Sequence, residues 1–288
     1  MSQSLEQLSA SVPGSTPALM QWIQGQLAAG HSTQTLEKSL IDSGWVASVA
    51  QAALAACTAT PNPSVARSEP VALPGPDLQA LPSEIDVGDR RVQVLMTLQR
   101  PQLVLFGNLL SDEECDHIVD EARPAMARSR TVASHGTLEE INPDRTSDGM
   151  FFKRGQTPVV QKLEARIARL LHWPLENGEG LQVLNYLPGA QYKPHHDYFS
   201  PLEPSSAAIL QRGGQRVGTM VIYLNEVEAG GCTYFPETQL RIHPRKGSAV
   251  FFSYAGPHAQ TLTLHAGEPV LQGEKWIATK WLREREFQ

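Results

Sequence analysis

His195 and Asp197 are the residues whose types and spacing most directly suggest chemistry, and they lie in NYLPGAQYKPHHDYF, residues 185–199. In a strand, alternate side chains share a face, so these two point together while His196 points the other way. His265, in TLTLHAGEPV, is the natural third ligand. Two histidines and one carboxylate bind one face of octahedral Fe(II) and leave three positions open for co-substrate and O2. The pattern indicates a metal centre, although a bare H-x-D is also common on solvated strands.

A lysine near the C-terminus is the second residue of interest. The odd positions of KWIATKWLR share one face of the predicted strand, namely Lys275, Ile277, Thr279, Trp281 and Arg283. A lysine on the inner face of a barrel needs a partner, because a lone buried charge is very costly. A bound dicarboxylate would supply that partner. The alternative is an outward-facing lysine at the start of the strand.

Five ordered blocks of sequence carry a resemblance to a known family. They are RPQLVLFGNLLSDEEC, LQVLNYLPGAQYKPHHDYF, GGQRVGTMVIYLNEVEAGGCTYFP, PRKGSAVFF and LHAGEPVLQGEKWIATKWL. Together they resemble the Fe(II)/2-oxoglutarate-dependent oxygenases, specifically the prolyl 4-hydroxylase branch, over roughly residues 98–284. The resemblance implies a double-stranded β-helix, a jelly roll whose mouth holds the iron.

The resemblance also implies roles for individual residues. The metal ligands it implies are His195, Asp197 and His265. Lys275 resembles the residue that pairs with the far carboxylate of 2-oxoglutarate. Tyr186 and Thr233 match positions that form hydrogen bonds to the same co-substrate; the alternatives are a core tyrosine and a β-turn hydroxyl.

On the substrate side, Tyr192, Arg216 and Trp281 match family positions near the peptide proline. Family members often end in KW-[IL]-H, with a histidine near the substrate, whereas this chain places Arg283 there. Arginine is longer and stays charged, so the target peptide is expected to differ.

The polar stretch 127–155 has poor periodicity, and by family position it should form the loop that covers the substrate. Arg145, Ser147 and Phe151 are its candidate contacts. Loops of more than about 15 residues without a functional or disordered role are uncommon, but an ordinary long loop is the alternative.

The expected activity is hydroxylation of an unactivated C–H, most favourably peptidyl-proline at C4, with decarboxylation of 2-oxoglutarate to succinate and CO2. Fe(II), 2-oxoglutarate, O2 and L-ascorbate as reductant are the implied cofactors. Asp197 is present, whereas related halogenases lack that carboxylate. The alternatives are the same chemistry on a free amino acid, a small metabolite or another side chain, and a non-catalytic metal-binding sensor with a partner-binding N-terminus.

The remaining pattern predicts an α+β fold. Helices are expected at SDEECDHIVDEAR, with capping-box spacing at its start, and at 157–171. Short segments separated by Gly/Pro turns then follow, and they predict strands at LQVLNYL, GTMVIYLNEV, GSAVFFSY and KWIATKWL. Helices followed by many short strands favour a jelly roll with helices on one side.

The first third of the chain differs in composition from the rest. Residues 1–57 are rich in alanine and poor in charge, and apolar residues at helical spacing predict three short helices. They form either a small module that binds a protein partner or a packing extension. Residues 58–90 contain six prolines and predict an extended linker. The oxygenase-like domain is predicted over 91–288.

The amino-acid composition limits the kinds of partner and cellular location that are expected. The chain has 288 residues, 41% hydrophobic, with 24 Lys+Arg against 30 Asp+Glu and a net charge of -6. That balance argues against a nucleic-acid partner. Three scattered cysteines favour a reducing compartment, and no apolar run suits a membrane span or a secretory leader. A cytoplasmic location is expected.

Overall fold

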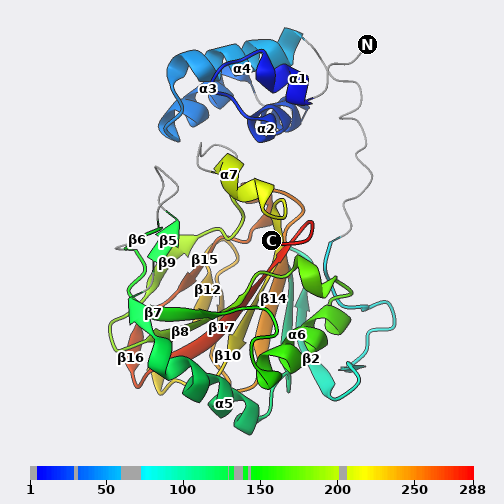
Figure 1. The fold of residues 1–288 in the computed structure, drawn as a ribbon, viewed down its shortest axis with the longest axis vertical. Coiled ribbons are helices and arrows are strands. Elements are labelled where there is room, and N and C mark those ends of the chain that lie inside the picture. Colours follow the sequence, from blue (N-terminus) through cyan, green and yellow to red (C-terminus); the bar gives the residue numbers. More distant parts are fainter. Residues whose placement is uncertain are drawn as a thin grey trace. The chain divides into compact units, whose positions relative to one another are not determined.

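A computed structural model describes residues 5–28, 32–59, 73–128, 130–132, 139–141, 144–200 and 206–288. The chain divides into two compact units, and the second begins at Leu73 and contains the β-sheets (Figure 1). Among the described residues no helix is both long and apolar enough to cross a membrane.

The N-terminal residues form helices around a core of their own. The helices are α1 (Leu5–Ala10), α2 (Pro17–Ala28), α3 (Thr33–Asp42) and α4 (Ala47–Ala59). Pro17 starts α2 at a position where its missing N–H costs nothing. Gly44 follows α3 with a positive φ of 92°, which glycine adopts freely. Leu8, Leu19, Ile23 and other apolar side chains fill the centre.

Two expectations for this part of the chain need correction. The described N-terminal residues contain four helices instead of three, because α1 is a short helix with too few apolar positions to give a periodic signal. The predicted linker 58–90 is also too long. Residues 60–72 lie outside the described residues, but β1 (Glu84–Asp86) pairs with β2 (Arg91–Leu98), and Val87 is buried in the core of the second unit. The part of the predicted linker that the structure describes, residues 73–90, therefore belongs to the second unit.

The described part of the second unit is built on two main antiparallel sheets, with two further two-stranded pairs. Its strands are β1 (Glu84–Asp86), β2 (Arg91–Leu98), β3 (Gln102–Gly107), β4 (Ala127–Arg128), β5 (Arg130–Val132), β6 (Glu139–Ile141), β7 (Asp148–Phe152), β8 (Leu181–Tyr186), β9 (Tyr192–His195), β10 (Arg216–Tyr223), β11 (Ala229–Gly230), β12 (Thr233–Phe235), β13 (Leu240–Ile242), β14 (Ala249–Ser253), β15 (His265–Gly267), β16 (Val270–Gln272) and β17 (Lys275–Arg283). The four predicted strands correspond to β8, β10, β14 and β17. The predicted loop 127–155 is partly wrong, because β7 extends the large sheet by pairing with β8.

The strand order identifies the architecture. The large sheet runs β1-β2-β3-β14-β10-β17-β8-β7-β4, and a smaller one runs β13-β12-β15-β9, with β5-β6 and β11-β16 as the two-stranded pairs. The chain passes from β8 to β9, from β10 to β12, and from β14 through β15 to β17, so it alternates between the two sheets. This alternation is that of a jelly roll. The predicted α+β class with a jelly-roll core is confirmed.

Two cores hold the second unit together, one on each face of β17. Helices α5 (Asp112–Ala122) and α6 (Pro158–Leu170) cover one face of the large sheet (Figure 1). The predicted capping box is present, with Ser111 and Glu114 as partners. Even-numbered residues of β17, among them Trp276 and Ala278, pack into this helix-covered core, and Ile277 packs into the core between the sheets. The odd-numbered residues are thereby directed toward the small sheet. A further short helix, α7 (Ser206–Gln211), is assigned to the first unit.

Candidate active site

The three predicted ligands meet at one end of the small sheet. His195 on β9 and His265 on β15 are directly opposite each other in the antiparallel pair, and Asp197 follows β9 by two residues. Their ligand atoms all lie within 4.8 Å of one another. Asp197 Oδ1 is 3.6 Å from His195 Nε2, and Asp197 Oδ2 is 3.6 Å from His265 Nε2. The arrangement fits the three-ligand face of a divalent metal.

Backbone carbonyls fix the orientation of both imidazoles. His195 Nδ1 is 2.9 Å from the carbonyl oxygen of Lys193, and His265 Nδ1 is 3.0 Å from that of Thr263. A carbonyl only accepts, so Nδ1 carries the hydrogen and each Nε2 presents its lone pair to Asp197. Burial, with a smaller effect of His195, lowers the pKa of His265 to about 4. A neutral imidazole is the form that binds a metal.

Lys275 is a buried cation at the far side of the same pocket. It starts β17, pairs with Tyr186 on β8, and is 2% exposed. Burial lowers its pKa to about 8. Its ammonium lies 5.5 Å from the centre of the Tyr186 ring and forms no ion pair or hydrogen bond with another described residue. A buried ammonium facing a pocket without a carboxylate partner fits a site for an anionic ligand.

The two other residues assigned to the co-substrate also line the pocket. Thr233 on β12 accepts a hydrogen bond of 2.8 Å from the hydroxyl of Tyr223. Because that lone pair is used, the hydrogen of Thr233 remains available for donation into the pocket. Tyr223 was not singled out from the sequence, since a tyrosine in a buried strand is ordinarily a core residue. Its contact with Thr233 depends on the packing of β10 against β12.

An aromatic and cationic wall lies next to the metal ligands. The ring of Tyr192 stacks on His195, with centroids 3.6 Å apart. The guanidinium of Arg145 lies 5.1 Å from the centre of the Tyr192 ring and donates a 2.8 Å hydrogen bond to Gln182 Oε1. Phe151 is 52% exposed, and its ring centre is 6.5 Å from that of Trp281. The structure thus brings Tyr192, Arg145 and Trp281 to one pocket, whereas the other predicted substrate contacts, Ser147, Phe151 and Arg216, are not among its lining residues.

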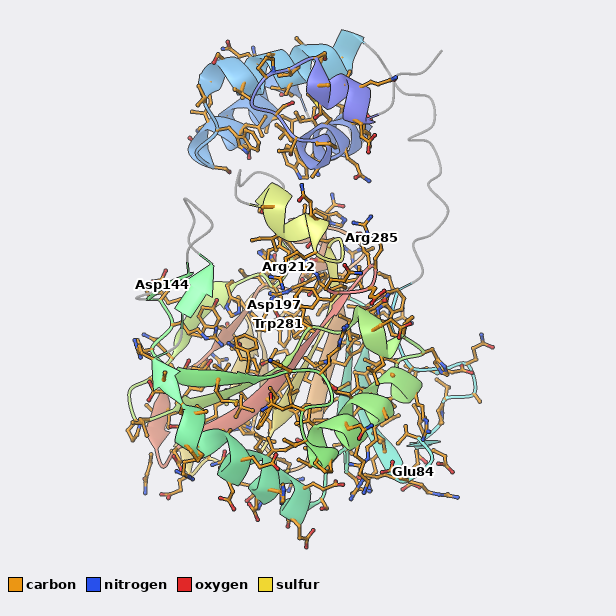
Figure 2. All side chains as sticks on the ribbon, viewed as in Figure 1. Glu84, Asp144, Asp197, Arg212, Trp281 and Arg285 are labelled. Atoms are coloured by element: carbon orange, nitrogen blue, oxygen red, sulfur yellow. The ribbon has the colours of Figure 1, made fainter. Side chains whose placement is uncertain are left out.

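Arg216 is held beside this wall by a carboxylate. Its Nε and Nη2 donate to the two oxygens of Glu179 at 2.7 and 2.9 Å. Its Nη1 donates to the backbone oxygen of Asp197 at 3.2 Å, and its guanidinium lies 3.9 Å from the centre of the Trp281 ring. In Figure 2 the labelled Asp197 and Trp281 lie toward the same end of the sheets, and both line the pocket.

The expected substrate contact of Arg283 is not supported by its position. This side chain is completely buried, does not line the pocket, and has Nη1 3.5 Å from Glu179 Oε1 and Nη2 3.1 Å from the carbonyl of Arg212. The register between β10 and β17 shifts at the end where Arg216 pairs with Arg283. Arg283 is the last residue of β17, and its contacts with Glu179 and the carbonyl of Arg212 hold it apart from the pocket lining.

The pocket as a whole contains both predicted groups of ligand-binding residues. Its lining residues are Arg145, Leu184, Tyr186, Tyr192, His195, Asp197, Val221, Thr233, His265, Ala266, Gly267, Lys275, Ile277, Thr279 and Trp281. His196, which strand alternation predicted to point away from the metal site, does not line the pocket. Its ring stacks on Tyr198, with ring centres 4.6 Å apart. A metal site, a buried cation and aromatic side chains in one pocket suit a metal-dependent reaction that uses an anionic co-substrate.

Comparison with known proteins places the chain in a family. The model of the 2OG-Fe(II) oxygenase superfamily matches residues 181–283. Prolyl 4-hydroxylase 5 of Arabidopsis thaliana is 37% identical over 221 residues, which are 69% of this chain and 74% of that protein. The chain belongs to the prolyl 4-hydroxylase family. Another family member, prolyl 4-hydroxylase 1 of the same plant, is 40% identical over 203 residues, 64% of this chain and 70% of its own length.

A solved structure resembles the prolyl 4-hydroxylase unit in sequence. The viral collagen prolyl hydroxylase from Paramecium Bursaria Chlorella virus-1, in its 2OG complex, is 29% identical, with a TM-score of 0.49 and coverage of 63% of this chain and 94% of that one. The match to the family model includes the three predicted metal ligands and Lys275, but it starts at residue 181. Helices α1–α4 therefore lie outside it.

The residues of the pocket fit the cofactors of a 2OG-Fe(II) oxygenase. The two imidazoles and one carboxylate are the donor set of non-heme Fe(II), and they leave coordination positions for 2-oxoglutarate and O2. The buried ammonium of Lys275 matches the second carboxylate of 2-oxoglutarate. The family and the geometry agree on Fe(II), 2-oxoglutarate and O2.

Proposed function

We propose that this protein is an Fe(II)- and 2-oxoglutarate-dependent dioxygenase that hydroxylates proline at C4 in a protein or peptide. One observation carries the proposal: Lys275, a buried cation with no ion-pair partner among the described residues, shares a pocket with the complete triad of His195, Asp197 and His265. A structural metal site would have no use for an unpaired ammonium at that position. Family membership supports the same chemistry.

Different residues of the pocket bind the co-substrate and the substrate. Bound Fe(II) supplies the oxidising chemistry that couples decarboxylation of 2-oxoglutarate, to succinate and CO2, with hydroxylation of a C–H. Lys275 pairs with the remote carboxylate, and Thr233 donates a hydrogen bond beside it. Both contacts hold the co-substrate in one orientation, which reduces the entropy lost in reaching the reactive geometry.

The aromatic wall suits a proline ring. Tyr192 and Trp281 provide flat aromatic surfaces in the pocket that holds the predicted metal ligands, and Arg216 is held against the Trp281 ring by Glu179. A pyrrolidine ring stacks on such surfaces. L-ascorbate is proposed as the reductant that restores Fe(II) after turnover without substrate, in keeping with the prolyl 4-hydroxylase family.

A second candidate has the same chemistry on a free amino acid or another small carboxylate. It is favoured by Arg145, which is 5% exposed, lines the pocket and forms no ion pair with a described carboxylate. A substrate carboxylate would neutralise it. Proline-containing peptides and free amino acids should be compared as stimulants of 2-oxoglutarate turnover. Stimulation by the amino acids alone would favour this second candidate.

The main test is turnover of 2-oxoglutarate to succinate by the purified protein with Fe(II) and ascorbate. His195→Ala and Asp197→Ala should abolish it, because each removes a ligand from a three-ligand site. His196→Ala is the matched control, since this neighbouring imidazole stacks on Tyr198 and does not line the pocket. Undiminished turnover in both ligand variants would exclude the assignment. Metal binding without any turnover would support the non-catalytic sensor instead.

The N-terminal helices are proposed to bind a protein partner. They have their own core, and Ile41 and Val46 remain 42% and 65% exposed on their surface. Val46→Glu should weaken co-purification of such a partner and leave 2-oxoglutarate turnover unchanged. A cytoplasmic location stays a prediction, with which the three buried, free cysteines agree.

A further inference from the structure

Two hydroxyl groups behind the metal ligands form a chain that ends on Asp197. Thr219 Oγ1, on β10, donates to Asp197 Oδ2 at 2.8 Å. The hydroxyl of Tyr254, the residue after β14, lies 3.0 Å from the same Thr219 oxygen. Thr219 is 0% and Tyr254 1% exposed, and neither lines the pocket. They therefore touch neither substrate nor co-substrate.

The direction of the two hydrogen bonds follows from the chemistry of the groups. A metal-binding carboxylate is ionised and only accepts, so the single hydrogen of Thr219 is committed to Asp197. Thr219 can then serve Tyr254 only as an acceptor, and the phenol must donate. Neither hydroxyl has another hydrogen-bond partner among the described residues. The chain consequently runs from Tyr254 through Thr219 to Asp197.

Both hydroxyls are carried by rigid backbone. Thr219 lies within β10, where it is paired on one side with Phe252 of β14 and on the other with Trp281 of β17. The backbone N–H of Tyr254 donates to the carbonyl of Val217 at 3.1 Å. Groups on paired strands are held more accurately than groups on loops, which suits a role in positioning.

We propose that Thr219 and Tyr254 are positioning residues that fix which oxygen of Asp197 binds the metal. The hydrogen bond from Thr219 occupies Oδ2 and restrains rotation of the carboxylate, so Oδ1 becomes the ligand. Arg216 restrains the same residue through its backbone oxygen. Single-oxygen coordination keeps a position open for 2-oxoglutarate. The proposal rests on the proposed function only in taking His195, Asp197 and His265 as metal ligands.

The test measures metal affinity without turnover. Apoprotein is titrated with Mn(II) under anaerobic conditions, and free Mn(II) is followed by electron paramagnetic resonance. Thr219→Val keeps the shape but removes the hydroxyl, and the Mn(II) dissociation constant should rise about 10- to 100-fold. Thr219→Ser keeps the hydroxyl and should retain most of the affinity. Tyr198→Phe is the matched control, because this nearby phenol has no hydrogen bond to a described residue.

Tyr254→Phe tests the outer member of the chain. Its effect on Mn(II) affinity should be smaller than that of Thr219→Val, since Thr219 can still donate to Asp197. In the double variant the affinity should equal that of Thr219→Val alone, because Tyr254 acts through Thr219. The double variant should also be more stable than Thr219→Val, in which the buried phenol has lost its acceptor.

The outcomes separate this inference from the proposed function. Unchanged Mn(II) affinity in Thr219→Val, or additive losses in the double variant, would overturn the positioning role. Wild-type protein that binds Mn(II) in a Thr219-dependent manner but never consumes 2-oxoglutarate would overturn the proposed activity and support the positioning role. Failure of the wild type to bind Mn(II) would overturn both.

Discussion

Strand β17 carries two buried lysines on opposite faces, and their surroundings differ completely. Lys280 and Lys275 are both 2% exposed. On the helix-covered face, Lys280 donates to Glu164 of α6 and to the backbone oxygen of Glu179. On the face toward the small sheet, Lys275 has no such partner among the described residues and borders the pocket.

The difference teaches how to separate a structural charge from a ligand-binding one. A buried ion pair is complete in the folded protein, so loss of either partner leaves an uncompensated charge. A buried cation without a partner costs stability in the absence of ligand and recovers that cost when an anion binds. Burial alone does not distinguish Lys275 from Lys280, whereas the presence of a carboxylate does.

Lys280→Met should give the largest effect, a loss of about 3–5 kcal/mol in the free energy of unfolding, because Glu164 is left charged and buried. Urea unfolding followed by circular dichroism measures it. Lys162→Met is the matched control on the exposed side of α6, where Lys162 is 54% exposed in its ion pairs with Asp89 and Glu114. The control substitution should lower the free energy of unfolding by less than about 1 kcal/mol. Equal losses in the two variants would contradict the distinction.

Lys275→Met should weaken 2-oxoglutarate binding by about 2–5 kcal/mol, because the buried carboxylate of the ligand then has no counter-charge. Calorimetric titration of the Mn(II)-loaded protein with 2-oxoglutarate measures this. Stability without ligand should be unchanged or higher, the opposite of Lys280→Met. If Lys275→Met lost stability but bound 2-oxoglutarate with normal affinity, Lys275 would have a structural role and no role in binding the co-substrate.

Glu164→Gln in the Lys280→Met background should restore part of the lost stability. The substitution removes the unpaired charge, while its amide oxygen can still accept the hydrogen bond that Gly155 N–H donates to Glu164 Oε2 at 2.8 Å. Urea midpoints of the single and double variants test the point. A double variant less stable than Lys280→Met would show that the charge of Glu164 is not the source of the loss.

The smallest expected effect is on pH dependence. Burial lowers the pKa of Lys275 from 10.5 to about 8, so its ammonium loses its proton above that pH. Affinity for 2-oxoglutarate should be level below pH 8 and fall by about 10-fold for each further pH unit. Because the folded pKa lies below the unfolded one, the ligand-free protein should gain stability from this group between pH 8 and 10.5. Lys275→Arg should remove the fall in affinity, and its persistence would point to another group.

Much of the candidate site could be predicted from local sequence. Alternation along a strand put His195 and Asp197 on one face and His196 on the other, and the structure has that arrangement. Capping and periodicity located α5 and α6 within one or two residues. These features depend on neighbours a few residues away, so a linear pattern contains them.

Other features could not be predicted from the sequence because they depend on packing between distant segments. The substrate role of Arg283 was inferred from its match to a family position, and its contacts with Glu179 and Arg212 form only in the folded protein. Thr219 and Tyr254 gave no signal, since hydroxyl residues are common in strands and only the sheet brings theirs to Asp197. Residues 73–90 resembled a linker because their packing partners lie elsewhere in the chain.

The sequence by itself determined the kinds of side chain available, their alternation, and the family to which they belong. It placed two lysines in KWIATKWLR and could not say which one would be paired. Tertiary structure decided that, because the carboxylate of Glu164 is 116 residues from Lys280 and reaches it only when α6 packs on the sheet. The energy of a buried charge depends on the groups within a few ångströms, and the folded chain alone brings those groups together.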